Sequence, residues 1–207
     1  MTRNRLFDKR LDQEFVVKIP VQGSSSLRLI CDIKICDSKP WRRSFLRFVQ
    51  HNYGKAKYFD DTYEMIQVCM EFKDSSLHRF NSNCIEKVCQ FVGIETKIIS
   101  EDQDFLVLED GLEQRARQNE LDIKTQRIIE ICRSRGWTTY LNSEGGAEIY
   151  RKEDFKDKGI NIAFWRSELP PYPQFSTKFC PGLSILDLLM HIGPRGVKDM
   201  LHAGHLF

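Results

Sequence analysis

The sequence has no long apolar run. Its purely apolar stretches reach only about four residues, as in FLVL at residues 105–108. A helix that crosses a bilayer needs ~18 or more apolar residues in succession, so we expect no membrane span. The opening residues MTRNR are followed by no apolar segment either. We therefore expect no secretory leader and a cytoplasmic protein.

A strong excess of one charge is also missing. The chain has 31 basic and 29 acidic residues, a formal net charge of +2. Proteins that bind nucleic acids usually carry a clear basic excess, so we expect no nucleic-acid partner. The seven cysteines are an odd number and contain no C-x-x-C pair, which argues against a zinc ribbon and a disulfide framework. Most of them should be reduced side chains that fill apolar space.

Metal ligands at regular spacing are scarce. His202 and His205 are three residues apart, and His191 lies about one helix away. Nothing in the spacing supplies a third ligand for a zinc ion. We interpret these histidines as surface or packing residues and predict no metal site.

The residues that are present predict a folded protein of mixed structure. With 41% hydrophobic and 29% charged residues, 207 residues can form one large domain, and we expect a single domain over residues 1–207. Periodicity predicts strands at 15–21, 27–35, 96–99, 138–141 and 161–165, and helices at 41–49, 59–72, 77–92, 121–135, 150–158 and 183–191. Strands that alternate with helices indicate an α/β fold, with a parallel or mixed sheet, flanking helices and a helical middle segment.

Two segments stand apart from this pattern. Residues 101–122 hold eight acids against Arg115 and Arg117, which predicts an acidic, solvated loop or lid. Residues 170–175, PPYPQF, predict a stiff extended connector before the last helix.

Residues 39–58 hold six Lys and Arg residues and no acid, interleaved with aromatic residues. One interpretation is an anion-binding surface for a nucleotide or a sugar phosphate. The other, which we favour, is an amphipathic helix with a solvated basic face. A nucleic-acid accessory role would rest on this segment alone.

Other candidate site residues lie in the second half of the chain. Lys124 and Arg127 fall in the first turn of a predicted helix, where positive charge opposes the helix dipole. They either bind a phosphate or carboxylate near the strand ends or are simply solvated. Asn142, Gly145 and Gly146 follow a predicted strand directly. Two glycines allow a ligand to approach the backbone, but an ordinary turn explains them as well.

Ser184 and Asp187 have the spacing S-x-x-D. A pair of nucleophile and acid is conceivable, with Asp187 as the candidate catalytic group. Because Ser184 follows Pro181-Gly182 at a helix start, we favour a helix cap. No serine lies in a G-x-S-x-G pattern, so nothing indicates a hydrolase elbow.

An ordered set of residues over nearly the whole chain resembles the WbqC-like family of bacterial surface-polysaccharide loci. The set comprises Arg3-Asn4-Arg5, Ile19-Pro20-Val21, Trp41, Tyr53, Tyr58-Phe59, Asn81, Gly93-Ile94, Lys124-Thr125, Arg127, Tyr140-Leu141-Asn142, Gly145-Gly146, Tyr150, Phe155, Tyr172, Gln174-Phe175, Phe179 and residues 183–187. The resemblance implies a Rossmann-like arrangement and a cytoplasmic role in O-antigen or surface-glycan (lipopolysaccharide) biosynthesis.

The activity implied is that of a transferase that joins an aminoacyl (glycine-type) or acyl group to an amino sugar, possibly a nucleotide-linked one. The implied substrate-binding residues are Arg3, Asn4, Arg5, Lys124, Arg127, Asn142, Gly145, Gly146, Tyr172 and Gln174. No cofactor is certain, although a nucleotide or nucleotide sugar is a candidate ligand. Partners would be the sugar substrate and either a second copy of the chain or other enzymes of the glycan pathway.

One departure from the family pattern affects these expectations. Members that resemble this chain begin with a strand, a Q-P-x-x-x-P-x-x-G-Y-F turn and an acidic strand before the R-N-R segment. Nothing in this sequence matches those parts, which resemble the first strand and phosphate-facing turn of Rossmann-like nucleotidyltransferases. Either the chain is a fragment or truncated frame, or it has diverged from the family's chemistry. The alternative function is therefore a non-catalytic sugar-nucleotide-binding or scaffold protein of a glycan assembly.

Overall fold

The computed structural model describes residues 3–23, 28–100 and 103–207. Contacts within the chain gather in two compact units. Unit 1 comprises Met1–Ser100 and Pro170–His202, and unit 2 comprises Glu101–Leu169 and Ala203–Phe207. Each unit has a hydrophobic core of its own. The single domain expected over residues 1–207 stays a prediction.

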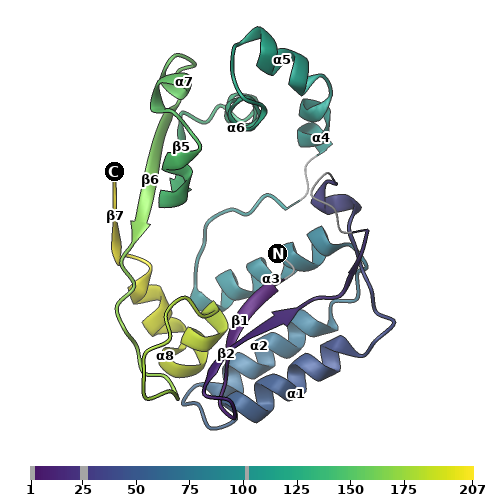
Figure 1. Cartoon of the computed structure of the whole chain (residues 1–207), viewed down its shortest axis with the longest axis vertical. Helices are drawn as coiled ribbons and strands as arrows, with labels where there is room; N and C mark the ends of the chain where they lie inside the picture. The colour runs from purple at the N-terminus through teal and green to yellow at the C-terminus, as the bar shows by residue number, and fades with distance from the viewer. Residues whose placement is uncertain (1–2, 24–27, 101–102) are drawn as a thin grey trace. The chain divides into compact units, whose positions relative to one another are not determined.

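Unit 1 is built mainly from helices. The helices α1 (Trp41–Tyr53), α2 (Phe59–Glu71) and α3 (Leu77–Val92) lie side by side (Figure 1) and carry the expected helical middle segment. The helix α8 (Ile185–Met200) packs against α2 and α3. It is longer than the pattern predicted, because Gly193 leaves helical geometry at φ 73° and the chain then resumes the helix.

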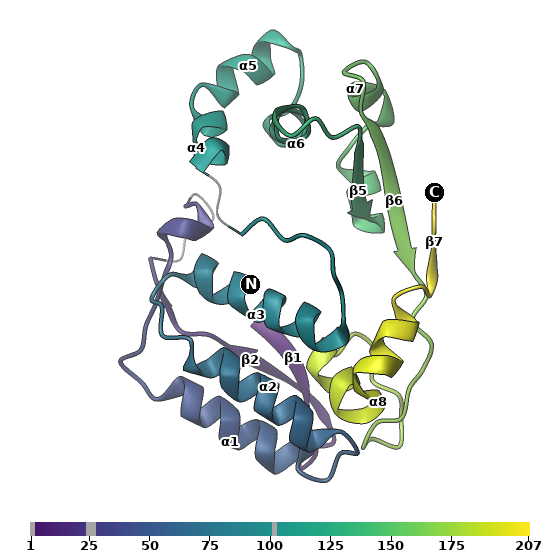
Figure 2. The ribbon, with the colours of Figure 1, turned by 180° about the vertical axis from the view of Figure 1, so that it is seen from behind.

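A β-hairpin covers one face of these helices (Figure 2). It pairs β1 (Arg3–Asp8) with β2 (Gln13–Lys18) in antiparallel register, with Arg3 opposite Lys18. The second half of β1 is buried, and Leu6 and Phe7 join the core that Val49 and the other inward side chains of the helices form. Each large apolar side chain buried in this way contributes about 1.5–3 kcal/mol.

The strand predicted at 27–35 is mostly wrong. Its described residues form the short helix η1 (Ile30–Asp32) and then β4 (Lys34–Ile35), which pairs with β3 (Val21–Gln22). Alternating apolar residues predict a half-buried strand. Leu29 and Ile30 are 46% and 43% exposed, whereas Ile35 is buried and Ile33 packs against the same small core.

Unit 2 contains a small mixed sheet in the order β5-β6-β7. The strands β5 (Thr139–Ser143) and β6 (Asn161–Ser167) are parallel, and β7 (Gly204–Leu206) pairs with β6 antiparallel. The helices η2 (Glu144–Glu148) and α7 (Lys152–Lys156) connect β5 to β6. The helix α6 (Ile123–Ser134) contributes Ile129 and Cys132 to the core. The mixed α/β class is therefore confirmed.

Two further expectations are corrected in this region. Residues 96–99 form no strand, and the sheet of unit 2 begins only at β5. The acidic segment 101–122 is helical over most of its described part, as α4 (Gln103–Glu109) and α5 (Leu112–Gln118). Arg115 explains the order: its guanidinium binds the carbonyls of Leu108 and Asp110 and both carboxylate oxygens of Glu130. One arginine thus ends α4 and ties it to α6.

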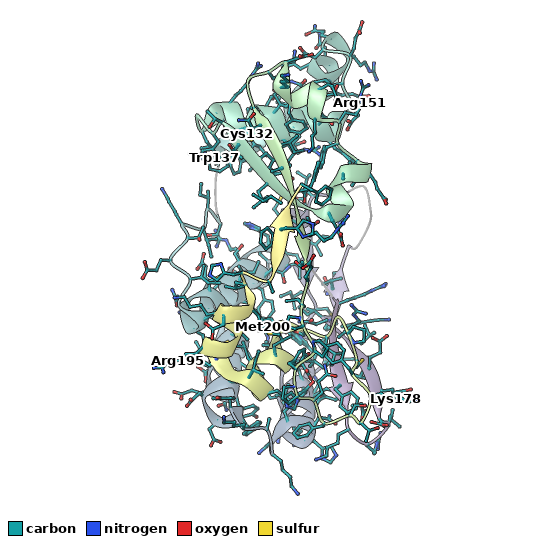
Figure 3. All side chains as sticks on the ribbon, turned by 90° about the vertical axis from the view of Figure 1, so that its left-hand side faces the viewer. Cys132, Trp137, Arg151, Lys178, Arg195 and Met200 are labelled. Atoms are coloured by element: carbon teal, nitrogen blue, oxygen red, sulfur yellow. The ribbon has the colours of Figure 1, made fainter. Side chains whose placement is uncertain are left out.

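Side chains of both units are drawn in Figure 3. Cys132 and Trp137 lie together at the end of α6, where the Trp137 amide donates to the Cys132 carbonyl at 2.8 Å. Arg195 and Lys178 extend outward from unit 1 in the same view and are exposed. The helices α3 and α8 have 16 residues each, and none of the helices described here combines the length and apolarity that a bilayer crossing requires.

Candidate functional site

A cavity of about 550 Å³ lies within unit 1. Its walls come from β1, β2, α1, α2, α3 and the start of α8, and they are mostly apolar. Four polar residues interrupt this lining, namely Arg3, Asn4, Asn81 and Ser184. A concave, largely apolar space of this size with a few polar groups is typical of small-molecule sites.

Three cysteines also line the cavity: Cys69 on α2, and Cys84 and Cys89 on α3. The thiols of Cys69 and Cys84 are hydrogen-bonded to each other, which lowers the pKa of Cys69. The same bond, together with burial, raises the pKa of Cys84.

The strand β1, which lines the cavity, is hydrogen-bonded through its backbone to the start of α8. The amide of Ser184 donates to the carbonyl of Arg5 at 2.7 Å. The hydroxyl of Ser184 accepts from the amide of Leu186 at 3.2 Å and so caps α8, as the sequence predicted. Asn4 turns its side-chain oxygen to the amide of Arg5 at 3.1 Å. The capping role explains why a serine occupies this position of the S-x-x-D pair, and no role as a nucleophile is needed.

Asp187 is fully buried in unit 1 and has no exposed surface. Its Oδ1 accepts a hydrogen bond from the Tyr53 hydroxyl at 2.7 Å, and its Oδ2 accepts one from the Tyr172 hydroxyl at 2.7 Å. The Tyr53 hydroxyl in turn accepts from the amide of Phe7 at 2.8 Å. Both carboxylate oxygens are thus bound by protein groups, and the geometry makes Asp187 a buried acceptor that links four segments of unit 1.

His191 lies one turn further along α8. Its ring packs edge-on against Tyr53 and Phe175, and its Nε2 is buried without a hydrogen-bond partner among the described residues. Burial lowers the pKa of His191, and the nearby charge of Asp187 only partly offsets this effect. The imidazole is therefore held in its neutral form.

Tyr172, Gln174 and Arg5 bind other parts of unit 1. Gln174 donates to the carbonyl of Cys180 at 3.0 Å and accepts from its amide at 2.7 Å, which closes the loop between them. Arg5 pairs with Glu14 across the hairpin at 3.5 Å. The connector at 170–175 has no regular secondary structure, as predicted, and the hydrogen bond from Tyr172 to Asp187 holds it against the core.

The predicted residues of unit 2 lie around the start of α6 and the end of β5. Asp122 caps α6 by accepting from the amides of Lys124 at 2.8 Å and Thr125 at 3.1 Å. Burial would raise the pKa of Asp122, but the bonds from Thr125 and Lys124 hold it below its usual value. A carboxylate of the chain itself thus occupies the helix terminus at which a ligand anion was one of the two expectations.

Arg127 is partly buried and paired with an acid. Its guanidinium binds both carboxylate oxygens of Glu109 on α4, with Nη2 at 2.9 Å from Oε2. This bond raises the pKa of Arg127 further. The pair joins α4 to α6, so an anion at this position would have to compete with Glu109.

Asn142 lies near the end of β5, and Gly145 and Gly146 lie in η2, which follows it. A Cβ at Gly146 would lie 2.6 Å from Nδ2 of Asn142, whereas one at Gly145 would meet nothing within 4 Å. A side chain at Gly146 would therefore have to displace that of Asn142, whereas Gly145 faces open space. Burial, reinforced by Tyr150, raises the pKa of Tyr140 beside this turn to about 12.

The structure brings some of the predicted residues together. Arg3 and Asn4 share the cavity with Ser184, and Tyr172 meets Asp187. The residues in unit 2 form a separate group within that unit. Asn81 and the three thiols were not predicted as site residues, although the spacing of Asn81, Cys84 and Val88 on one face of α3 was a usable signal. Within the described part of the chain, no three His, Cys, Asp or Glu side chains group as metal ligands would.

Comparisons with known proteins agree with the resemblance that the residues indicated. The WbqC-like protein family matches residues 1–199. One relative, from Mycobacterium tuberculosis (strain ATCC 25618 / H37Rv) and named Uncharacterized protein Rv1507c, is 22% identical over 179 residues, which cover 86% of this chain and 71% of the relative. No solved structure matches the chain significantly. The chain belongs to the WbqC-like protein family.

Proposed function

We propose that this protein transfers an aminoacyl or acyl group to the amino group of a sugar, possibly a nucleotide-linked one, in surface-glycan biosynthesis. The observation that carries the proposal is the cavity of unit 1, with about 550 Å³ of mostly apolar space and the side chains of Arg3, Asn4 and Asn81 in its lining. Apolar walls suit an acyl chain or a sugar face, and a few polar groups fix its orientation. The parallel β5–β6 pair with its helices would be the remaining part of a Rossmann-like arrangement.

The proposed roles follow from the chemistry of these groups. In the transfer, the sugar nitrogen forms a bond to the carbonyl carbon, the bond from that carbon to the leaving group breaks, and the amine loses one proton. The Arg3 guanidinium would pair with a phosphate or carboxylate of the ligand. The amides of Asn4 and Asn81 would donate to the carbonyl oxygen, on which negative charge develops.

A specific observation also favours the second candidate, a sugar-nucleotide-binding protein without catalysis. Among the described residues that line the cavity there is no Asp, Glu or His to accept the amine proton. Asp187, which the sequence suggested, is closed off by two tyrosine hydroxyls. The two candidates share the cavity as binding site and differ only in turnover.

Calorimetry with a uridine-diphosphate amino sugar tests the binding step that both candidates require. We expect Arg3→Gln to weaken binding by about tenfold, the effect of losing one charge-assisted hydrogen bond. Arg195→Gln is the matched control, because Arg195 is exposed on α8 outside the cavity lining. Absence of binding to the unaltered protein, or equal binding by all three proteins, would refute the cavity as the sugar-nucleotide site.

A further inference from the structure

Unit 1 has a second hollow, which lies on a different face of α1 from the apolar cavity. It is an open groove of about 590 Å³ between α1 and the end of β1 with the turn that follows it. Its lining consists of Asp8, Arg10, Ser44, Arg47, Phe48, Gln50, His51 and Asn52. None of these residues lines the apolar cavity, so the two sites are distinct within the described chain.

Arginine and histidine side chains reach the groove from two elements. Arg47 and His51 are four residues apart on α1 and therefore share one helix face. Arg10 comes from the turn between β1 and β2. All three are exposed, and no ion pair joins them to another of the described residues. Two guanidinium groups from different elements thus line one hollow.

The groove contains one acid, Asp8, and one of its two carboxylate oxygens is bound by the chain. Oδ1 of Asp8 accepts from the amides of Arg10 at 2.9 Å and Leu11 at 3.2 Å, and the residue is only 7% exposed. Its hydrogen bonds hold the turn that presents Arg10. Asn52 is likewise committed, since it accepts from the amide of Lys9 and donates to the carbonyl of Phe48. The groups left for a ligand are then the donors of Arg10, Arg47, Ser44 and Gln50, beside the second carboxylate oxygen of Asp8.

We propose that this groove binds the diphosphate group of a small molecule, with Arg10 and Arg47 each binding phosphate oxygens and Ser44 donating a further hydrogen bond. Guanidinium groups match phosphate because their planar forks make two parallel hydrogen bonds. Two such forks facing one hollow suit an anion with two adjacent phosphates better than a single phosphate. The site stands independently of the transfer reaction, because it requires only an anion and not an acyl group.

The charge distribution along α1 supplies a matched control. Arg43 lies on the same helix, four residues before Arg47, and is exposed like it, yet it does not line the groove. Removing Arg43 lowers the local positive charge by the same amount as removing Arg47. A real site distinguishes the two substitutions, and a diffuse basic surface does not.

The test is calorimetric titration of the full chain with inorganic pyrophosphate and with orthophosphate, at low and at physiological salt. We expect pyrophosphate to bind more tightly than orthophosphate. Arg47→Gln and Arg10→Gln should each weaken pyrophosphate binding by about tenfold, and Arg43→Gln by less than about twofold. Circular dichroism of the three variants checks that these exposed substitutions leave the helices intact.

Other results overturn the proposal. These are no heat of binding with pyrophosphate, binding unchanged by Arg47→Gln and Arg10→Gln, or an equal loss in Arg43→Gln. A duplex oligonucleotide that displaces pyrophosphate and depends equally on all three arginines would assign the face to nucleic acid instead. Because the apolar cavity is not involved, failure here leaves the calorimetry with the amino sugar unaffected.

Discussion

The hydroxyl of Tyr53 donates a 2.7 Å hydrogen bond to Oδ1 of Asp187, across 134 residues of chain. The bond is buried, and it joins the end of α1 to the first turn of α8. Because the same hydroxyl accepts from the amide of Phe7, one side chain satisfies a carboxylate and a backbone donor at once. Such a cluster stabilises the fold only while every member is paired.

Tyr53→Phe should therefore destabilise the protein. The substitution leaves Oδ1 of Asp187 and the amide of Phe7 without a partner in the core, at a cost of about 2–3 kcal/mol. Urea unfolding followed by circular dichroism measures the change. Tyr63→Phe is the control, since the Tyr63 hydroxyl makes only a long 3.5 Å bond to the Leu46 carbonyl and should cost less than about 0.5 kcal/mol. Equal losses in both variants would contradict the buried cluster.

The buried imidazole of His191 predicts a pH dependence of stability. Burial lowers its pKa in the folded protein from the ordinary 6.5, so the unfolded chain takes up the proton first as the pH falls. The contribution of His191 is complete above about pH 6.5 and is lost progressively below it. Urea unfolding at about pH 7.5 and pH 5.5 should show a smaller loss for His191→Gln than for the unaltered protein. Identical losses would mean that His191 takes up a proton in the folded protein as readily as in the unfolded chain.

Gly93 ends α3 in the left-handed region, at φ 76°. Its carbonyl accepts a 2.8 Å hydrogen bond from Nζ of Lys198 on α8, so the end of α3 has little freedom to move. Gly93→Ala should lower the free energy of unfolding by about 1 kcal/mol, because alanine disfavours positive φ. Gly145→Ala, at a position with open space and no positive φ, should be near neutral in the same denaturant series. A neutral Gly93→Ala would contradict the cap geometry.

Arg115→Lys tests which contacts keep the acidic segment helical. Lysine keeps the charge but cannot reach Glu130 and the carbonyls of Leu108 and Asp110 together, as the arginine fork does. Hydrogen exchange should become faster across α4 and α5 and stay unchanged in unit 1. Arg117→Lys alters only an exposed pair with Glu113 on one helix and should leave the exchange rates as they are. Protection of α4 and α5 in Arg115→Lys would show that other contacts hold them.

The helices of unit 1 could be predicted from the sequence because their apolar spacing is local information. Trp41, Phe45 and Val49 recur at helical intervals, and α1 begins where that stripe begins and ends one turn beyond it, at Tyr53. The same reasoning failed for 101–122, because the order there depends on Arg115 and Arg127 meeting acids 15 and 18 residues away. Counting acids in a segment cannot reveal which distant side chains pair with them.

The candidate site likewise combines features that local spacing predicts with features that depend on residues far apart in the sequence. Ser184 as a cap followed from spacing, whereas the burial of Asp187 did not, since it needs Tyr53 and Tyr172 from other segments. The cavity itself is a tertiary feature, lined from six elements, and only Arg3 and Asn4 of its lining were predicted as site residues. The sequence predicted that most cysteines fill apolar space. This agrees with the position of Cys69, Cys84 and Cys89 in the cavity wall, but it did not indicate that they line the same cavity.

Mass spectrometry of reaction mixtures tests the central claim most directly. The protein is incubated with a uridine-diphosphate amino sugar and, in parallel, with an acyl coenzyme A and an aminoacyl adenylate. Val88→Phe fills the cavity from α3, and Val68→Phe places the same ring on an exposed position of α2 outside the lining. The account predicts an amide product from one of the donors, lost in Val88→Phe and retained in Val68→Phe. No amide product with either donor, from folded protein that binds the amino sugar, would contradict the transferase and leave the binding protein.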